Sequence, residues 1–219
     1  MKEDPFGRDM RVDGDEVDLH PEPQAAPELP SHQRADARRN RAQILQAAET
    51  CFAEQGVVVP IDDIARLAGV GVGTVYRHFP TKEALIEAVV ITRMEKLTAQ
   101  ARALATSDDP GAAFFSFLGR LADEGSAKRD LVDALGGAGI DLKQRTSAEK
   151  GELTDAIGVL LKRAQASGEV RPDVELDDLF VLVMGACASS PHAESGFSQQ
   201  RMLSVVCDGL RAAHVPTLG

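Results

Sequence analysis

One short stretch of this chain gathers the residues that are best suited to contact a nucleic-acid duplex. Hydroxyl, guanidinium, imidazole and ammonium groups donate hydrogen bonds to phosphates, a small apolar side chain contacts a thymine methyl, and glycine permits close approach of the backbone. The stretch supplies all of these and no acid: Gly71, Val72, Gly73, Thr74, Tyr76, Arg77, His78 and Lys82. We therefore expect these residues to form a DNA-binding surface.

A helix-turn-helix would present this surface. Residues 60–79 read as two short helices around a tight turn, with Gly69 where the chain reverses and the small residue Ala65 where the helices cross. The apolar residues fall on the inner side: Ile64, Ala68, Val70 and Val75. The second helix would then point its polar residues and glycines outward. Lys82 would follow at the start of the next helix, beside unpaired backbone N–H groups.

The rest of the chain also has the periodicity of helices, with apolar residues at three- and four-residue steps. Before the motif a helix is expected from Arg38 to Gln55, and after it a long helix from Lys82 to about Thr106. Further helices are expected over Pro110–Glu124, Lys128–Leu135, Ser147–Ser167, Glu175–Ala188 and Phe197–Ala213. These assignments predict an all-α protein with a three-helix DNA-binding domain over residues 34–82 and a helical regulatory and dimerisation domain over residues 83–219.

The net charge of −10 is unevenly distributed. Residues 1–33 carry three basic and nine acidic side chains together with five prolines, which predicts a disordered acidic leader. This leader either competes with DNA for the neighbouring basic residues or is passive, and both hypotheses stay open. Residues 34–87 are neutral overall and contain an arginine cluster opposed by Asp36 alone: Arg34, Arg38, Arg39 and Arg41. Such a local basic patch suits phosphate contact in spite of the acidic whole.

Several functional classes find no support in the sequence. The N-terminus lacks the apolar segment of a signal peptide, and the longest apolar run, residues 179–188, is far shorter than the roughly 20 residues of a membrane helix. We therefore expect a cytoplasmic protein without membrane contact. Nucleophile, metalloprotease and metal-ligand motifs are absent from the chain, which predicts no enzymatic activity, no cofactor and no metal site.

The segment AGVGVGTVYRHFPTKEALIEAV, residues 68–89, resembles the DNA-binding module of the TetR family of bacterial regulators. The resemblance extends over about residues 38–90. It implies an all-helical homodimer that binds double-stranded DNA at a near-palindromic operator. Most members of the family repress transcription until a small molecule binds the C-terminal domain, and the resemblance implies the same for this chain.

The resemblance further implies a role for individual residues. Thr74 and Tyr76 would contact the operator backbone and bases, while His78 and Lys82 would each contact a phosphate. Two arginines of the preceding helix would meet the DNA backbone: Arg38 and Arg39. The alternatives to these contacts are a core aromatic for Tyr76 and a hydrogen-bonded structural histidine for His78, and the surrounding motif favours DNA contact for both.

The chain departs from the family pattern at the start of the first motif helix. Pro60 stands where many relatives have a Thr or Ser that caps this helix and touches a phosphate. Asp62 and Asp63 follow, and two carboxylates disfavour contact with phosphate. We therefore expect the arginines of the preceding helix to carry more of the backbone contact.

The C-terminal half resembles the family only in its layout of helices, so its expected sites rest on apolar patterning. A ligand pocket is expected among Phe114, Phe115, Phe117, Leu118, Leu121, Leu160 and Met184. These residues would equally suit an ordinary packed core. A dimer interface is expected from the last two helices, which are apolar over more than one face: Leu179, Val183, Met202, Val205, Val206 and Leu210.

Together these features favour a sequence-specific DNA-binding transcriptional regulator. The leading hypothesis is a repressor that an unknown small-molecule effector releases from its operator. An activator or a ligand-independent regulator is the alternative within the same class. The alternative outside that class is an enzyme or small-molecule-binding protein whose helix-turn-helix does not bind DNA.

Overall fold

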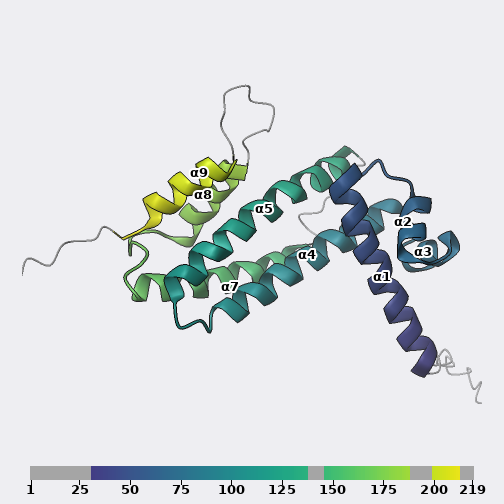
Figure 1. Ribbon diagram of the computed structural model, residues 1–219, viewed down its shortest axis with the longest axis horizontal. Coiled ribbons are helices and arrows are strands. Elements are labelled where there is room, and N and C mark those ends of the chain that lie inside the picture. Colours follow the sequence, from purple (N-terminus) through teal and green to yellow (C-terminus); the bar gives the residue numbers. More distant parts are fainter. Residues whose placement is uncertain (1–30, 138–145, 188–198, 213–219) are drawn as a thin grey trace, which may run out of the picture.

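The computed structural model describes residues 31–137, 146–187 and 199–212, and these residues are largely helical (Figure 1). The helices are α1 (Ser31–Gln55), α2 (Ile61–Ala68), α3 (Val72–His78), α4 (Lys82–Leu104), α5 (Pro110–Gly137), α7 (Ser147–Ala166), α8 (Leu176–Cys187) and α9 (Gln199–Leu210). Within the described ranges, the single β contact is an antiparallel bridge between Val170 and Arg211. The predicted all-α class is confirmed.

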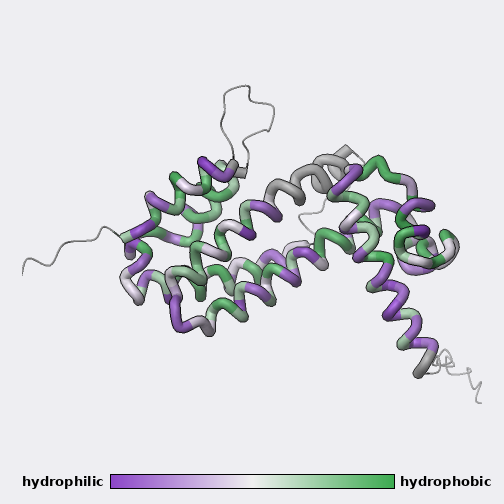
Figure 2. The backbone as a smooth tube through the Cα atoms, viewed as in Figure 1, coloured by the Kyte–Doolittle hydropathy of each residue, from purple (hydrophilic) through white to green (hydrophobic). Residues whose placement is uncertain are grey.

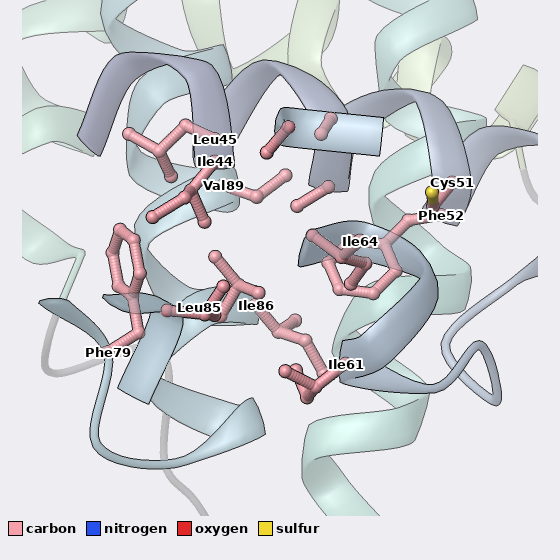
Figure 3. Close-up of a cluster of buried hydrophobic side chains, with 14 of the residues drawn as sticks. Ile44, Leu45, Cys51, Phe52, Ile61, Ile64, Phe79, Leu85, Ile86 and Val89 are labelled. Atoms are coloured by element: carbon pink, nitrogen blue, oxygen red, sulfur yellow. The ribbon is translucent and has the colours of Figure 1, made fainter. Parts of the chain in front are cut away.

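The first three helices and the beginning of α4 enclose one hydrophobic core (Figure 3). Its large buried side chains come from α1, α2, α4 and the segment after α3, and include Ile44, Phe52, Ile64, Phe79, Leu85 and Val89. The short helix α3 adds one buried residue, Val75. Helices α1 and α2 pack on α3 and hold it in place, while most of its surface stays outside the core.

The turn between α2 and α3 follows from local sequence. Gly69 has a φ of 68°, in the left-handed region that glycine adopts at low cost. Its N–H donates to the carbonyl oxygen of Arg66 at 3.2 Å, and the N–H of Val70 donates to that of Ala65 at 3.0 Å. These two bonds close the C-terminus of α2, and the helix-turn-helix expected over residues 60–79 is present.

The starts of α4 and α2 are stabilised differently. Thr81 Oγ1 accepts a 3.1 Å hydrogen bond from the backbone N–H of Ala84, so Thr81 caps α4. Pro60 precedes α2 and provides no side-chain cap. Asp62 and Asp63 lie in the first turn of α2, where the helix dipole favours negative charge.

The long helix α4 continues from the first core into a second one (Figure 1). In the second half of the molecule α4 packs on α5 and α7, while α8 packs on α5 and α9. The largest side chains that are fully enclosed there are Phe114, Phe117, Leu118, Ile157, Leu160, Leu179 and Leu210. None of the helices in the described ranges is long and apolar enough to cross a membrane.

Two helix boundaries differ from expectation. α5 is a single helix where two were expected, at Pro110–Glu124 and Lys128–Leu135. The lone Gly125 between them costs about 1 kcal/mol relative to alanine, which is too little to end a helix that packs on its neighbours. α1 begins at Ser31, so residues 31–33 of the expected leader belong to this helix. Residues 1–30 of that leader lie outside the described residues.

Candidate nucleic-acid interface and pocket

Helix α3 presents most of its residues to solvent. Val75 is 1% exposed and anchors the helix, and Val72 packs partly against the same core. Tyr76 is 48% exposed, so it is not a core aromatic. Gly73 and Arg77 are exposed, while Thr74 and His78 are partly buried. The expected outward surface of the second motif helix is therefore present.

The protein itself does not require glycine at positions 71 and 73. A Cβ added at Gly71 or Gly73 would meet no atom within 4 Å, and neither residue has a positive φ. Gly69 differs, because its backbone conformation does require glycine. The fold therefore leaves room for a side chain at both positions.

Three basic side chains meet near the C-terminus of α3. His78 is partly buried, and burial lowers the pKa of its imidazole; the nearby charges of Arg77 and Arg41 lower the pKa further. The guanidinium of Arg41, on α1, lies 5.0 Å from the centre of the Phe79 ring. Arg77 Nη2 donates to Thr74 Oγ1 at 3.3 Å. The imidazole is thus held next to two cations, an arrangement suited to an anionic partner.

Lys82 has a structural partner that its sequence position did not reveal. Its Nζ donates a 2.6 Å hydrogen bond to the carbonyl oxygen of Val59, in the loop before α2. An ammonium group has three donors, so two remain for a phosphate. No local signal predicts this contact, because the two residues are 23 positions apart.

The arginines of α1 fall into two groups. Figure 1 shows the first part of α1 projecting past α2 and α3, and Figure 2 shows this part as mainly hydrophilic. Arg38 and Arg39 are exposed there, and Arg39 pairs with Asp36 at 3.0 Å. Arg41 instead reaches Phe79 at the end of α3. The sequence placed Arg41 in the same basic cluster as Arg38 and Arg39, but only those two were assigned to DNA contact, although the i, i+3 spacing of Arg41 from Arg38 was an available signal.

A pocket of about 610 Å³ opens between α4, α5, α7 and α8. Its walls are mainly apolar, with Leu97, Leu121, Leu153, Phe180 and Met184 among them. Two of these, Leu121 and Met184, belong to the expected ligand pocket. The pocket also touches Val90 and Met94 of α4, which are buried in the core of the N-terminal domain.

The other residues expected at the pocket have different surroundings. Phe114, Phe117, Leu118 and Leu160 are at most 1% exposed and fill the closed core of the C-terminal domain. Phe115 is partly buried, and its ring lies 4.2 Å from the guanidinium of Arg211. None of these five lines the pocket described above, because neighbouring helices pack directly against them.

The residues expected at a dimer interface also divide. Leu179, Val183 and Leu210 are at most 2% exposed, because they pack inside a single protomer. Met202 and Val206 are partly buried, and Val205 is 67% exposed. α8 adds exposed apolar residues that were not selected from the sequence, Val181 and Leu182, which are 72% and 41% exposed.

The fold and this surface define a helix-turn-helix DNA-binding protein with an attached helical domain. No group of three or more His, Cys, Asp or Glu side chains in the described part of the chain is arranged to hold a metal. Residues 44–89 match the family described as bacterial regulatory proteins, tetR family. Residues 109–212 match the C-terminal domain described as transcriptional regulator SbtR-like.

Solved structures and curated proteins resemble the chain over most of its length. A TetR transcription regulatory protein from Mycobacterium vanbaalenii is 40% identical, with 82% of this chain and 99% of that one covered and a TM-score of 0.68. A TetR transcriptional regulator from Streptomyces coelicolor is 34% identical, with coverages of 79% and 99% and a TM-score of 0.67. The transcriptional regulator UidR of Escherichia coli is 29% identical over 151 residues, 64% of this chain and 74% of UidR.

This chain therefore belongs to the TetR family, and it is a DNA-binding transcriptional regulator.

Proposed function

We propose that this protein is a cytoplasmic repressor that binds a near-palindromic operator as a homodimer and releases it when a small molecule fills the pocket. The observation that carries the proposal is the double role of Val90 and Met94. Both are buried in the core that holds the helix-turn-helix, and both line the pocket of the C-terminal domain. A ligand in that pocket therefore contacts side chains on which the DNA-binding domain is built.

The release step follows from α4. A ligand that requires more room between α4 and α7 shifts α4, and the N-terminal core moves with α4 because Leu85, Ile86 and Val89 belong to it. In a dimer, such a shift changes the separation of the two α3 helices, which must span half-sites about 34–36 Å apart. The effector must bind the released arrangement more tightly, since equal affinity shifts no equilibrium.

The surface of α3 and the basic side chains around it contact the DNA. Thr74 and Tyr76 contact the operator backbone and base edges, Val72 contacts a thymine methyl, and the bare positions Gly71 and Gly73 let the α3 backbone approach closely. The phosphate contacts come from Arg38, Arg39, Arg77, His78 and Lys82, to which the structure supports adding Arg41. The homodimer forms through α8 and α9, where Val181, Leu182 and Val205 are exposed on one protomer.

Footprinting tests the proposal. The purified protein should protect a near-palindromic sequence in the DNA that flanks its own gene, and an extract of the source cells should abolish the protection. Absence of a protected palindrome anywhere in the genome would reject operator binding. A promoter fusion then separates repression from activation, because loss of the protein raises expression only in the first case.

A pocket-filling substitution tests the coupling. Thr154→Trp on α7 places an indole in the pocket and blocks the effector, so the extract should no longer change the affinity of this variant for the operator. The matched control is Val159→Trp, on the same helix at a 50% exposed position that does not line the pocket. This control should respond to the extract like the wild type.

A further inference from the structure

The pocket contains an ion pair that is too long for a hydrogen bond. Arg93 Nη1, on α4, lies 3.8 Å from Glu124 Oε2, on α5. The Arg93 side chain is 14% exposed and the Glu124 side chain is 42% exposed. Glu124 Oε2 is buried and has no hydrogen-bond partner among the described residues. A buried polar atom without a hydrogen bond is unfavourable, so this pair favours a ligand that completes its hydrogen bonds.

The pair marks a polar section of a mainly apolar pocket. Arg93, Leu97 and Glu124 line both the pocket and a smaller outer groove of about 200 Å³. The groove also contains Arg120 and Asp123, which are exposed and do not line the pocket. The pair therefore separates the interior of the pocket from a solvent-facing groove between α4 and α5.

The charges that line the pocket balance. Arg93 and Lys150 are opposed by Glu124 and Asp177. A carboxylate that bound Arg93 would lie next to Glu124, and an ammonium that bound Glu124 would lie next to Arg93. Like charges this close repel each other. For a charged ligand, attraction to one member of the pair is therefore offset by repulsion from the other.

A hydroxyl group satisfies both members. Its oxygen accepts a hydrogen bond from the guanidinium, and its hydrogen is donated to the carboxylate. The 3.8 Å separation leaves room for one oxygen at about 2.8 Å from each atom. The pocket volume of about 610 Å³ lies within the range of small-molecule sites, roughly 300–1,000 Å³.

We propose that the effector of this protein is a neutral, largely apolar molecule whose hydroxyl group bridges Arg93 and Glu124. The inference rests on the proposed function, since it assigns a chemical class to the effector of the same pocket. It excludes fatty-acid-like anions and lipophilic cations as preferred ligands.

Matched alkyl probes test this class without knowledge of the natural effector. Decan-1-ol, decanoate and decylammonium share a chain and differ in head group. Since the chain contains no Trp, binding is followed by displacement of the neutral dye Nile red from the full-length protein. At neutral pH, decan-1-ol should displace the dye at a concentration about tenfold below that of either ion.

Any apolar pocket would prefer the alcohol, because charged head groups are costlier to desolvate. Substitutions at Arg93 and Glu124 therefore supply the decisive comparison. Glu124→Gln leaves Arg93 without its opposing charge, so the affinity for decanoate relative to that for decan-1-ol should rise about tenfold. Arg93→Met should raise the affinity for decylammonium, relative to that for decan-1-ol, by a similar factor. Exchange of the two charges, Arg93→Glu with Glu124→Arg, should restore the wild-type order. Circular dichroism checks folding, and the single substitutions decide the question if the exchanged pair does not fold.

The outer groove offers matched controls. Asp123→Asn and Arg120→Met change charge by the same amounts on α5 but lie outside the pocket, so the order of the probes should stay that of the wild type. The proposal is overturned by a wild type that prefers either ion, by pair variants that keep the wild-type order, or by a protein that does not bind Nile red.

The proposed function is judged by a separate measurement, the affinity for operator DNA with and without bound probe. The expected order of the probes without any effect on DNA would support the ligand class and reject the release mechanism. Release of DNA by probes bound in another order would reject the ligand class and support the release mechanism.

Discussion

Lys82 Nζ donates a 2.6 Å hydrogen bond to the carbonyl oxygen of Val59. Val59 is 2% exposed and belongs to the N-terminal core, so the bond ties the first residue of α4 to the loop that precedes α2. The helix that reaches the pocket therefore starts at a fixed point of the DNA-binding domain. The same ammonium group retains two donors for a phosphate.

Lys82→Met separates these two roles. Loss of the bond to a buried carbonyl should lower the free energy of unfolding by about 1 kcal/mol, measured by urea denaturation. Loss of a phosphate contact should weaken operator binding and reduce the slope of log affinity against log salt by about 1. The control Lys162→Met removes the same charge from an exposed position on α7 and should change neither quantity. An unchanged salt slope in Lys82→Met would limit Lys82 to the structural role.

Gly73→Ala should change stability and DNA binding in opposite directions. A methyl group at this position meets no atom within 4 Å, and alanine favours a helix over glycine by about 0.5–1 kcal/mol, so the free energy of unfolding should rise. Since we propose that this side of α3 approaches DNA, the same methyl group should lower operator affinity. Urea denaturation and fluorescence anisotropy with labelled operator measure the two effects.

Gly151→Ala is the matched control for this substitution. Gly151 is an exposed residue of α7 whose added Cβ also meets no atom within 4 Å. It should raise stability by a similar amount and leave operator affinity unchanged. Equal operator affinities of Gly73→Ala and wild type would show that α3 does not approach the duplex at this residue.

The DNA-binding half was predictable because its determinants are local. Gly69 marks the turn through its own φ, Thr81 caps α4 three residues before its partner, and Val75 is the one buried residue of α3. Each signal can be read within one helical turn of sequence. The exception is the bond from Lys82 to Val59, which joins distant positions and therefore has no local pattern.

The pocket was only partly predictable. Periodicity identifies which face of a helix is apolar, but not where along the helix axis the neighbouring helices leave a space. Phe114 and Leu121 lie on one face of α5, about 10 Å apart along its axis. Phe114 is enclosed by neighbouring helices, whereas Leu121 lies where α4, α5, α7 and α8 leave a space. The pairing of Arg93 with Glu124 depends on the same packing of α4 on α5.

His78 should make stability depend on pH. Its pKa in the folded protein lies below the ordinary value of 6.5, so the unfolded chain binds a proton more readily than the folded one. The stabilisation is fully present above about pH 6.5 and is lost as the pH falls through the lowered pKa of the folded state. Between about pH 7.5 and about pH 5.5, the wild type should therefore lose more stability than His78→Gln, as measured by Tm.

Operator binding should have the opposite dependence at this residue. A phosphate beside His78 favours the imidazolium form, so acidification through the same range should strengthen binding by the wild type relative to His78→Gln. Anisotropy titrations at constant ionic strength provide the comparison. Parallel pH profiles of the two proteins would remove His78 from the set of phosphate contacts.

Val205→Asp should dissociate the proposed dimer without unfolding the protomer. Val205 is 67% exposed on α9, so a carboxylate there remains hydrated in one chain, whereas burial of the unpaired charge against a second chain costs several kcal/mol. Sedimentation should show a monomer, and circular dichroism should show an unchanged helix content. Operator affinity should fall steeply because the two α3 helices no longer bind together. Val159→Asp, on a 50% exposed position of α7, should remain dimeric. A dimeric Val205→Asp protein would place the contact between subunits elsewhere than on this face of α9.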